Sequence, residues 1–99
     1  MQCKVFSPGE WVEKDVLGKQ ITFDEITQEI GNLIAISQST CSRDMYKVVK
    51  VEEIRPARDG WDRQLVYFDG HKQRGFIREH YFNETKATNF PARAYRLAT

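Results

Sequence analysis

The sequence predicts a single α+β domain over residues 1–99, in which one amphipathic helix packs on an antiparallel sheet of four to six strands. The length of 99 residues suits one domain with one modest core. Apolar residues recur at helical spacing after residue 22, and two Asp-Gly pairs, at 59–60 and 69–70, lie between strand-like runs. The same elements would also suit a partly open small barrel.

A helix start is signalled at Thr22. Thr22 followed three residues later by Glu25 matches the capping box, in which the hydroxyl accepts from a backbone N–H and the carboxylate reaches back. The apolar stripe that follows predicts a helix over residues 23–37, in which Gly31 costs about 1 kcal/mol relative to alanine. The stripe comprises Phe23, Ile26, Ile30, Leu33 and Ile34.

A three-stranded meander is predicted over residues 45–78. Asp-Gly favours a two-residue type I′ turn, because both central residues need positive φ. Two such turns would pair Ile54 with Leu65 and Phe68 with His71, and side-chain alternation then sorts the strands into two faces. One face contains Val49, Val51, Glu53, Val66, Phe68, His71, Gln73, Gly75 and Ile77. The opposite face, the mixed face, contains Lys50, Glu52, Ile54, Arg63, Leu65, Tyr67, Lys72, Arg74 and Phe76.

The two ends of the chain predict shorter elements. Residues 3–6 and 10–16 have the composition of short strands, and residues 89–97 predict one more strand. Pro91 places that last strand at a sheet edge, because proline cannot donate to a ladder.

Charge is balanced overall but not along the chain. The net charge is +1, yet residues 1–44 carry 4 Lys/Arg against 7 Asp/Glu (−3), whereas residues 45–99 carry 11 against 7 (+4). A local basic patch in the meander half follows from this asymmetry. With no run of 18 apolar residues and no apolar leader, the sequence predicts a cytoplasmic protein without a membrane partner. Cys3 and Cys41 are then expected to be reduced.

The mixed face is the best indication of function. Aromatic rings beside guanidinium groups are typical of protein-binding hot spots, and equally of platforms for single-stranded nucleic acid. An exposed face of this kind would also suit a homodimer seam. A third interpretation makes its apolar members part of the core, covered by the N-terminal segment or the tail. The candidate partner-binding residues are Lys50, Trp61, Arg63, Tyr67, Lys72, Arg74 and Phe76.

Motifs for catalysis, metal or cofactor binding do not stand out. Cys3, Cys41, His71 and His80 lack the spacing of metal ligands, and no glycine-rich phosphate loop occurs. No catalytic residue, metal or cofactor is therefore predicted. The sequence favours a small non-enzymatic binding protein, such as a regulator, inhibitor or immunity-type protein, that acts on a protein partner. The alternative is a module that binds single-stranded nucleic acid through the same face.

Overall fold

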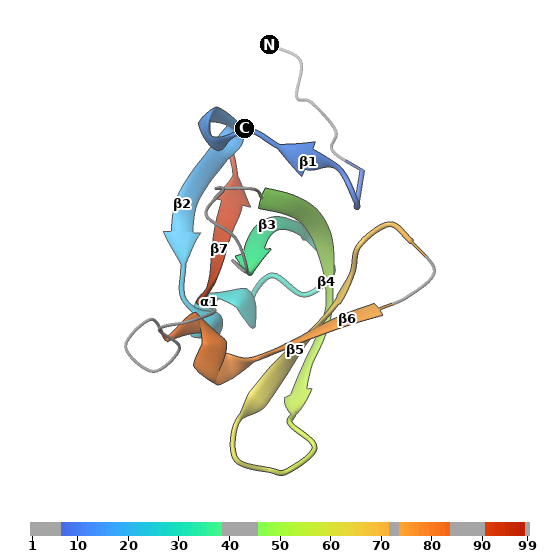
Figure 1. The fold of residues 1–99 in the computed structure, drawn as a ribbon, viewed down its shortest axis with the longest axis vertical. Helices are drawn as coiled ribbons and strands as arrows, with labels where there is room; N and C mark the ends of the chain where they lie inside the picture. The colour runs from blue at the N-terminus through green and yellow to red at the C-terminus, as the bar shows by residue number, and fades with distance from the viewer. Residues whose placement is uncertain (1–6, 39–45, 72–73, 84–90, 99) are drawn as a thin grey trace.

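The computed structural model describes residues 7–38, 46–71, 74–83 and 91–98. Within these ranges the chain forms a seven-stranded antiparallel sheet with few helical residues, and the sheet is open (Figure 1). The strands are β1 (Trp11–Val12), β2 (Leu17–Ile21), β3 (Leu33–Gln38), β4 (Tyr46–Pro56), β5 (Arg63–Phe68), β6 (Arg74–Arg78) and β7 (Ala92–Leu97). The helical segments are η1 (Lys14–Val16), α1 (Phe23–Ile26) and η2 (Glu79–Phe82).

The strand order is β2-β7-β3-β4-β5-β6, so β2 and β6 are the two edges of this path. β4 is the longest strand and pairs with β3, with β5 and, at its beginning, with β1. Two further backbone hydrogen bonds hold the β1 segment against β4. The Gly9 N–H donates to the Val48 carbonyl (2.8 Å), and the Val48 N–H donates to the Glu10 carbonyl (2.9 Å). The N-terminal segment therefore extends along β4 beside the end of β5.

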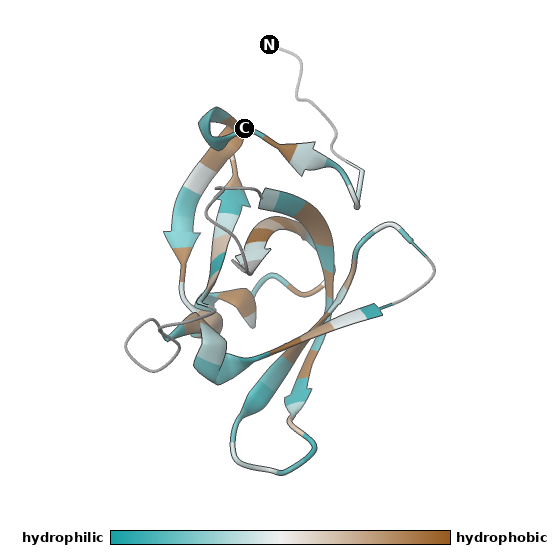
Figure 2. Ribbon diagram, in the orientation of Figure 1, coloured by the Kyte–Doolittle hydropathy of each residue, from teal (hydrophilic) through white to brown (hydrophobic). Residues whose placement is uncertain are grey.

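One apolar cluster joins elements from both ends of the strand order. Ile21 of β2, Phe23 of α1, Ala94 of β7 and Leu65 of β5 belong to the same buried core. Because strands near the two ends of the strand order contribute to one core, the sheet curves around its inner face, as Figure 1 shows. Figure 2 shows hydrophobic residues along the inner stretches of β3, β4 and β5. The remaining core members are Ile26, Ile34, Ile36, Val49, Val51, Ile77 and Ala92.

The predicted start of the helix is correct, but the helix over residues 23–37 is wrong. Both capping-box bonds are present: the Glu25 N–H donates to the Thr22 hydroxyl (3.2 Å), and the Thr22 N–H donates to the Glu25 carboxylate (3.2 Å). The helix ends after a single turn at Ile26. Gly31 then adopts φ +89° and donates its N–H to the Val51 carbonyl (2.7 Å), which directs the chain into β3.

The sequence of β3 shows why helical spacing predicted a helix where the structure has a strand. The run from Leu33 to Ile36 is apolar throughout, so it satisfies helical spacing and strand composition alike. In the structure β3 lies between β4 and β7 and pairs with both. Ile34 and Ile36 join the core cluster, and Ala35 between them is buried on the opposite face. An interior strand buried on both faces therefore replaces the second half of the predicted helix.

The β4–β5 connection confirms the predicted register but not the predicted turn. Ile54 pairs with Leu65 as expected. Gly60 has φ +76°, but Asp59 does not have positive φ, so the type I′ turn is wrong. The ladder continues to Ala57, whose N–H donates to the Asp62 carbonyl (2.7 Å), leaving residues 58–61 as the loop. The four-residue loop is centred on the same Asp59-Gly60 pair as the predicted two-residue turn, so the strands pair in the same register.

Two features break the predicted faces beyond this point. A bulge between Val51 and Glu53 shifts the register by one, so Val51 pairs with Tyr67 instead of Phe68. At the second Asp-Gly pair, Phe68 pairs with Arg74 rather than His71. A shift of three positions is odd and exchanges the faces of β6 relative to β5.

The tail prediction is also wrong in position. β7 lies inside the sheet, between β2 and β3, rather than at an edge. Pro91 precedes the strand, so it removes no donor from either ladder. Of the predicted N-terminal strands, residues 10–16 form β1 and η1, whereas residues 3–6 lie outside the described ranges.

Candidate functional site

The structure separates the predicted binding residues into three places. Trp61 lies in the β4–β5 loop and Arg63 begins β5. Tyr67 packs against the core from the inner face of β5. Lys50, Arg74 and Phe76 lie on the opposite, outer face, because Lys50 and Arg74 both align with Phe68 and Phe76 pairs with Val66. Lys72 lies outside the described residues. The single mixed face predicted from the sequence is therefore not formed.

The Tyr67 ring lies over Gly75, its cross-strand partner, which has no side chain. Gly75 pairs with Tyr67, and a Cβ built at Gly75 would overlap the Tyr67 ring. Burial, together with the nearby Asp69 charge, raises the pKa of the Tyr67 hydroxyl. Tyr67 is therefore half-buried and packs against the core from the inner face.

A cavity of about 570 Å³ lies near Trp61, and we call it the Trp61 cavity. It is formed where the end of β2 and the start of α1 face the β4–β5 loop and η2. Its lining combines aromatic walls with polar groups: Gln20, Ile21, Thr22, Phe23, Trp61, Asp62, Glu79, His80, Phe82 and Asn83. Phe23 and Phe82 contact each other, with ring centroids 5.5 Å apart. The lining comes from three separate segments, residues 20–23, 61–62 and 79–83, so the cavity exists only in the folded chain.

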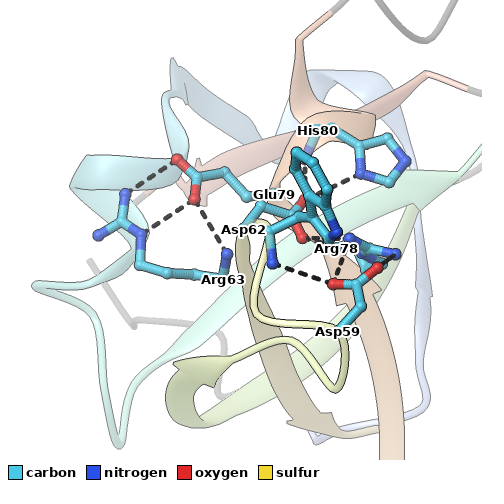
Figure 3. Close-up of polar contacts among 7 residues, drawn as sticks. Asp59, Asp62, Arg63, Arg78, Glu79 and His80 are labelled. Atoms are coloured by element: carbon cyan, nitrogen blue, oxygen red, sulfur yellow. Dashed lines mark hydrogen bonds and ion pairs between the residues drawn. The ribbon is translucent and has the colours of Figure 1, made fainter.

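Asp62 holds one side of this cavity together (Figure 3). Its Oδ1 accepts from Arg78 Nε (2.9 Å) and NH2 (2.7 Å). Its Oδ2 accepts from the His80 backbone N–H (3.1 Å) and lies 2.8 Å from His80 Nδ1. Burial alone would raise the pKa of Asp62, but the hydrogen bonds from Arg78 and His80 outweigh it and lower the pKa overall. The carboxylate therefore stays ionised and ties the loop to β6 and η2.

A second ion-pair group supports the other side (Figure 3). Arg63 donates to Glu79 from Nε (3.0 Å) and NH2 (3.0 Å), and from NH2 to Asp24 (2.7 Å). Its guanidinium also lies 5.0 Å from the Phe23 ring centroid. The bonds from Arg63 lower the pKa of Glu79, and those bonds in turn raise the pKa of Arg63. Arg63 thus links β5 to α1 and η2.

Trp61 is the most exposed of the large apolar residues in the described chain, at 88% of its full surface. Its backbone N–H donates to Asp59 Oδ1 (3.1 Å), and Asp59 also pairs with Arg78 (2.9 Å). The Asp62 carboxylate anchors the next residue. The backbone of the Trp61 loop is thus fixed on both sides while the indole remains in solvent.

The outer face, defined by Lys50, Arg55, Arg74 and Phe76, forms a second and shallower surface. Phe76 is 52% exposed, and the Arg55 guanidinium lies 5.2 Å from its ring centroid. A hollow of about 170 Å³ lies between these side chains and two carboxylates, those of Glu52 and Glu53. Arg55 pairs with Glu53 (3.3 Å), whereas Lys50 and Arg74 are exposed and form no ion pair within the described residues.

Sequence reasoning found Trp61 and Arg63 but missed the residues around them. Asp62, Glu79 and Phe82 were not candidates, and His80 was considered only for catalysis or metal binding. The available signal was the sequence Asp59-Gly60-Trp61-Asp62, where a turn carries a tryptophan between two carboxylates. That these carboxylates reach Arg78 and His80 depends on the β5–β6 register, which the sequence did not determine.

Across the described segments, no cluster of three or more His, Cys, Asp or Glu residues is arranged to hold a metal ion. No helix in the same segments is long and apolar enough to cross a membrane. Cys3 and Cys41 lie outside the described residues, and His71 is exposed at the β5–β6 loop.

No protein-family model matches this sequence, and comparison with curated proteins and with solved structures gives no significant match. Function must therefore be argued from the two surfaces themselves.

Proposed function

We propose that this chain is a small binding protein of the regulator, inhibitor or immunity type, and that it holds a protein partner at the Trp61 cavity. The observation that carries the proposal is Trp61: a tryptophan 88% exposed, on a loop fixed by ion pairs, beside an aromatic-lined cavity. Tryptophan is enriched among the residues that dominate protein-binding energy, and these residues tend to lie beside pockets.

The magnitude supports an anchor role. A tryptophan side chain buries about 150–250 Å² when it is covered, which at about 25 cal/mol per Å² amounts to roughly 4–6 kcal/mol before the costs of association. Fixing the loop in advance lowers the entropy lost on binding. The carboxylates Asp62 and Glu79 are already engaged by Arg78, His80 and Arg63, so their evident task is to position the loop and η2.

Affinity capture from the native host tests this proposal. The tagged chain is compared with Trp61→Ala and with Trp11→Ala, a matched control because Trp11 is also exposed (57%) but lies on β1. We expect one protein to be retained by the wild type and by Trp11→Ala, and to be lost with Trp61→Ala, with or without nuclease. Equal retention by both variants would rule out the Trp61 cavity as the binding site, and a second copy of the chain as the only retained protein would indicate a homodimer.

The outer face supports one alternative function, binding of single-stranded nucleic acid. Lys50 and Arg74, without ion pairs in the described segments, lie on either side of Phe68 on this face. The exposed Phe76 ring, two residues from Arg74 along β6, offers a stacking surface. Phosphate-dominated binding should weaken by roughly 0.7 log units per log unit of salt for each phosphate contacted. Affinity for a labelled oligonucleotide is measured across salt in the wild type and in the double variant Lys50→Glu with Arg74→Glu. This alternative expects binding that is steeply salt-dependent and lost in the double variant, and no binding at low salt would exclude it.

A further inference from the structure

We infer that the Trp61 cavity receives an arginine side chain of the protein partner. This inference rests on the proposed function, since it names the group that the partner would insert. Three features of the cavity support it: the surplus of carboxylates around it, the aromatic surfaces that line it, and a histidine ring in its lining that offers a hydrogen-bond acceptor.

The ion-paired groups around the cavity carry a net negative charge. Four carboxylates, from Asp24, Asp59, Asp62 and Glu79, share the two guanidinium groups of Arg63 and Arg78. The sum is −4 + 2 = −2. Arg58, an exposed cation on the loop, lies outside the lining, as do Asp24, Asp59, Arg63 and Arg78, and counting it leaves the sum at −1. The charged groups of the lining itself are the carboxylates of Asp62 and Glu79. An arriving cation therefore meets an attractive field, and an arriving anion meets a repulsive one.

The walls suit a planar cation in particular. The indole of Trp61 is the best aromatic surface for cation–π contact, and a guanidinium can stack flat on it. The chain already places a guanidinium over an aromatic ring twice, with Arg63 over Phe23 at 5.0 Å and Arg55 over Phe76 at 5.2 Å. A guanidinium also brings five donors, so it needs an acceptor in the cavity.

His80 supplies that acceptor. An ionised carboxylate can only accept hydrogen bonds, so in the neutral form of the imidazole the 2.8 Å contact with Asp62 Oδ2 places the ring proton on Nδ1. Nε2 then carries the lone pair, on a residue that lines the cavity. Asp62 is in turn fixed by Arg78, so the ring orientation is set before any ligand arrives. Arg63 and Arg78 each pair with two carboxylates, so their positive charges are already balanced within the cluster.

The test is a titration of the full 99-residue chain with N-acetyl-arginine amide, and separately with N-acetyl-citrulline amide, which has the same shape without the charge. The chemical shifts of the Trp61 and Trp11 indole N–H protons are followed by NMR. We expect saturable shifts at Trp61 alone and at least fivefold weaker binding of the citrulline compound. Equal binding of the two compounds, or equal shifts at the two tryptophans, would overturn the inference.

Charge variants sharpen the test. Asp24→Asn removes one carboxylate of the cluster at a side chain that is 84% exposed, so folding should be unaffected. Asp15→Asn makes the same charge change on η1, at the opposite end of β2 from the cavity. We expect two- to threefold weaker arginine binding for Asp24→Asn and no change for Asp15→Asn, and the same affinity in both would contradict the role of the cluster.

The outcome can be separated from that of the proposed function. If host-cell capture retains a protein through Trp61 while N-acetyl-arginine amide causes no shift, only the arginine inference fails. If the arginine compound binds at Trp61 while no protein is captured, the proposed partner fails and the cavity chemistry stands.

Discussion

Replacing Asp62 by asparagine tests the polar network that fixes the Trp61 loop. Asp62 is 16% exposed in its side chain and accepts four hydrogen bonds, two from Arg78 and two from His80. Asparagine keeps the shape and one acceptor oxygen. Its amide NH2, however, turns two donor hydrogens toward groups that are themselves donors. Two of the four bonds are therefore lost, and Arg78 keeps Asp59 as its one carboxylate partner.

The expected cost follows from these contacts. Hydrogen bonds to charged groups contribute about 1.5–3 kcal/mol each when buried. Arg78 is 34% exposed and retains its pair with Asp59, so water and Asp59 compensate for part of the loss. We expect the free energy of unfolding to fall by about 2 kcal/mol at pH 7, which lowers the melting temperature of a domain of this size by roughly 10 °C.

The loss should depend on pH in a defined direction. The pKa of Asp62 is lower in the folded chain than in the unfolded one, so its stabilisation is fully present above the unfolded value of about 3.9. It disappears as the pH falls through the folded pKa. The difference between wild type and Asp62→Asn should therefore be constant from pH 5 to 7 and shrink below about pH 4.

Urea unfolding followed by far-UV circular dichroism measures this difference, with Asp15→Asn as a control on an exposed acidic residue. A difference below about 0.5 kcal/mol at pH 7 would show that the network contributes little. A difference that stays the same at pH 3 would show that the charge of Asp62 is not its cause.

Three further predictions concern the elements that position the site. Gly70→Ala should destabilise the chain by about 2–4 kcal/mol, because its φ is +90° and a Cβ there would overlap the Pro8 carbonyl. Gly60→Ala is the matched control: its φ is +76° but the space around it is open, so urea unfolding should show a loss of only about 1–2 kcal/mol, and equal losses would contradict the close approach. Thr22→Ala should cost about 1 kcal/mol by the same assay, since it removes the bond to the Glu25 N–H, and no loss would mean that the cap is not formed in solution. Tyr67→Phe should lose less stability at alkaline pH than the wild type. Folding raises the pKa of the Tyr67 hydroxyl, so its contribution to the free energy of unfolding is present below about pH 10. That contribution is lost as the pH rises through the pKa of the folded state. If wild type and Tyr67→Phe lost stability equally between pH 9 and 12, Tyr67 would not be the group that titrates.

The sequence predicted the structure well where the signal was local. The capping box at Thr22 depends on residues within one turn, and both of its bonds are present. The Ile54–Leu65 pair was also correct, although for an incomplete reason. The observed loop of four residues and the expected loop of two are centred on the same Asp-Gly pair, so both give the same strand pairing. A correct register therefore did not require a correct turn.

The failures came from properties that are not local. Leu33 to Ile36 suits a helix or a doubly buried strand, and pairing with β4 and β7 decides between them. The second Asp-Gly pair belongs to a longer loop, in which Gly70 packs closely against Pro8, more than sixty positions earlier in the chain. Neither this approach nor the bulge after Val51 has a clear signature within its own segment.

The site was predicted in part for the same reason. Trp61 was a candidate because it lies next to the Asp59-Gly60 turn, which is a local property, although a tryptophan beside a tight turn more often folds onto the sheet edge. Arg63 was identified as a contact residue, but the structure engages it with Glu79 and Asp24, which come from two other elements. Arg74 and Phe76 remain together on the outer face, separated from Tyr67 by the odd shift in register. The composition of the predicted mixed face was therefore sensitive to one loop length and one bulge.

The most direct test of the central proposal is the affinity of the captured protein partner for two single variants, Trp61→Ala and Phe76→Ala, measured by calorimetry. Both residues are exposed aromatics, one at the Trp61 cavity and one on the outer face. If the cavity is the binding site, Trp61→Ala should weaken binding at least thirtyfold, which corresponds to about 2 kcal/mol, and Phe76→Ala should change it less than threefold. The reverse order of effects would place the partner on the outer face and contradict the account.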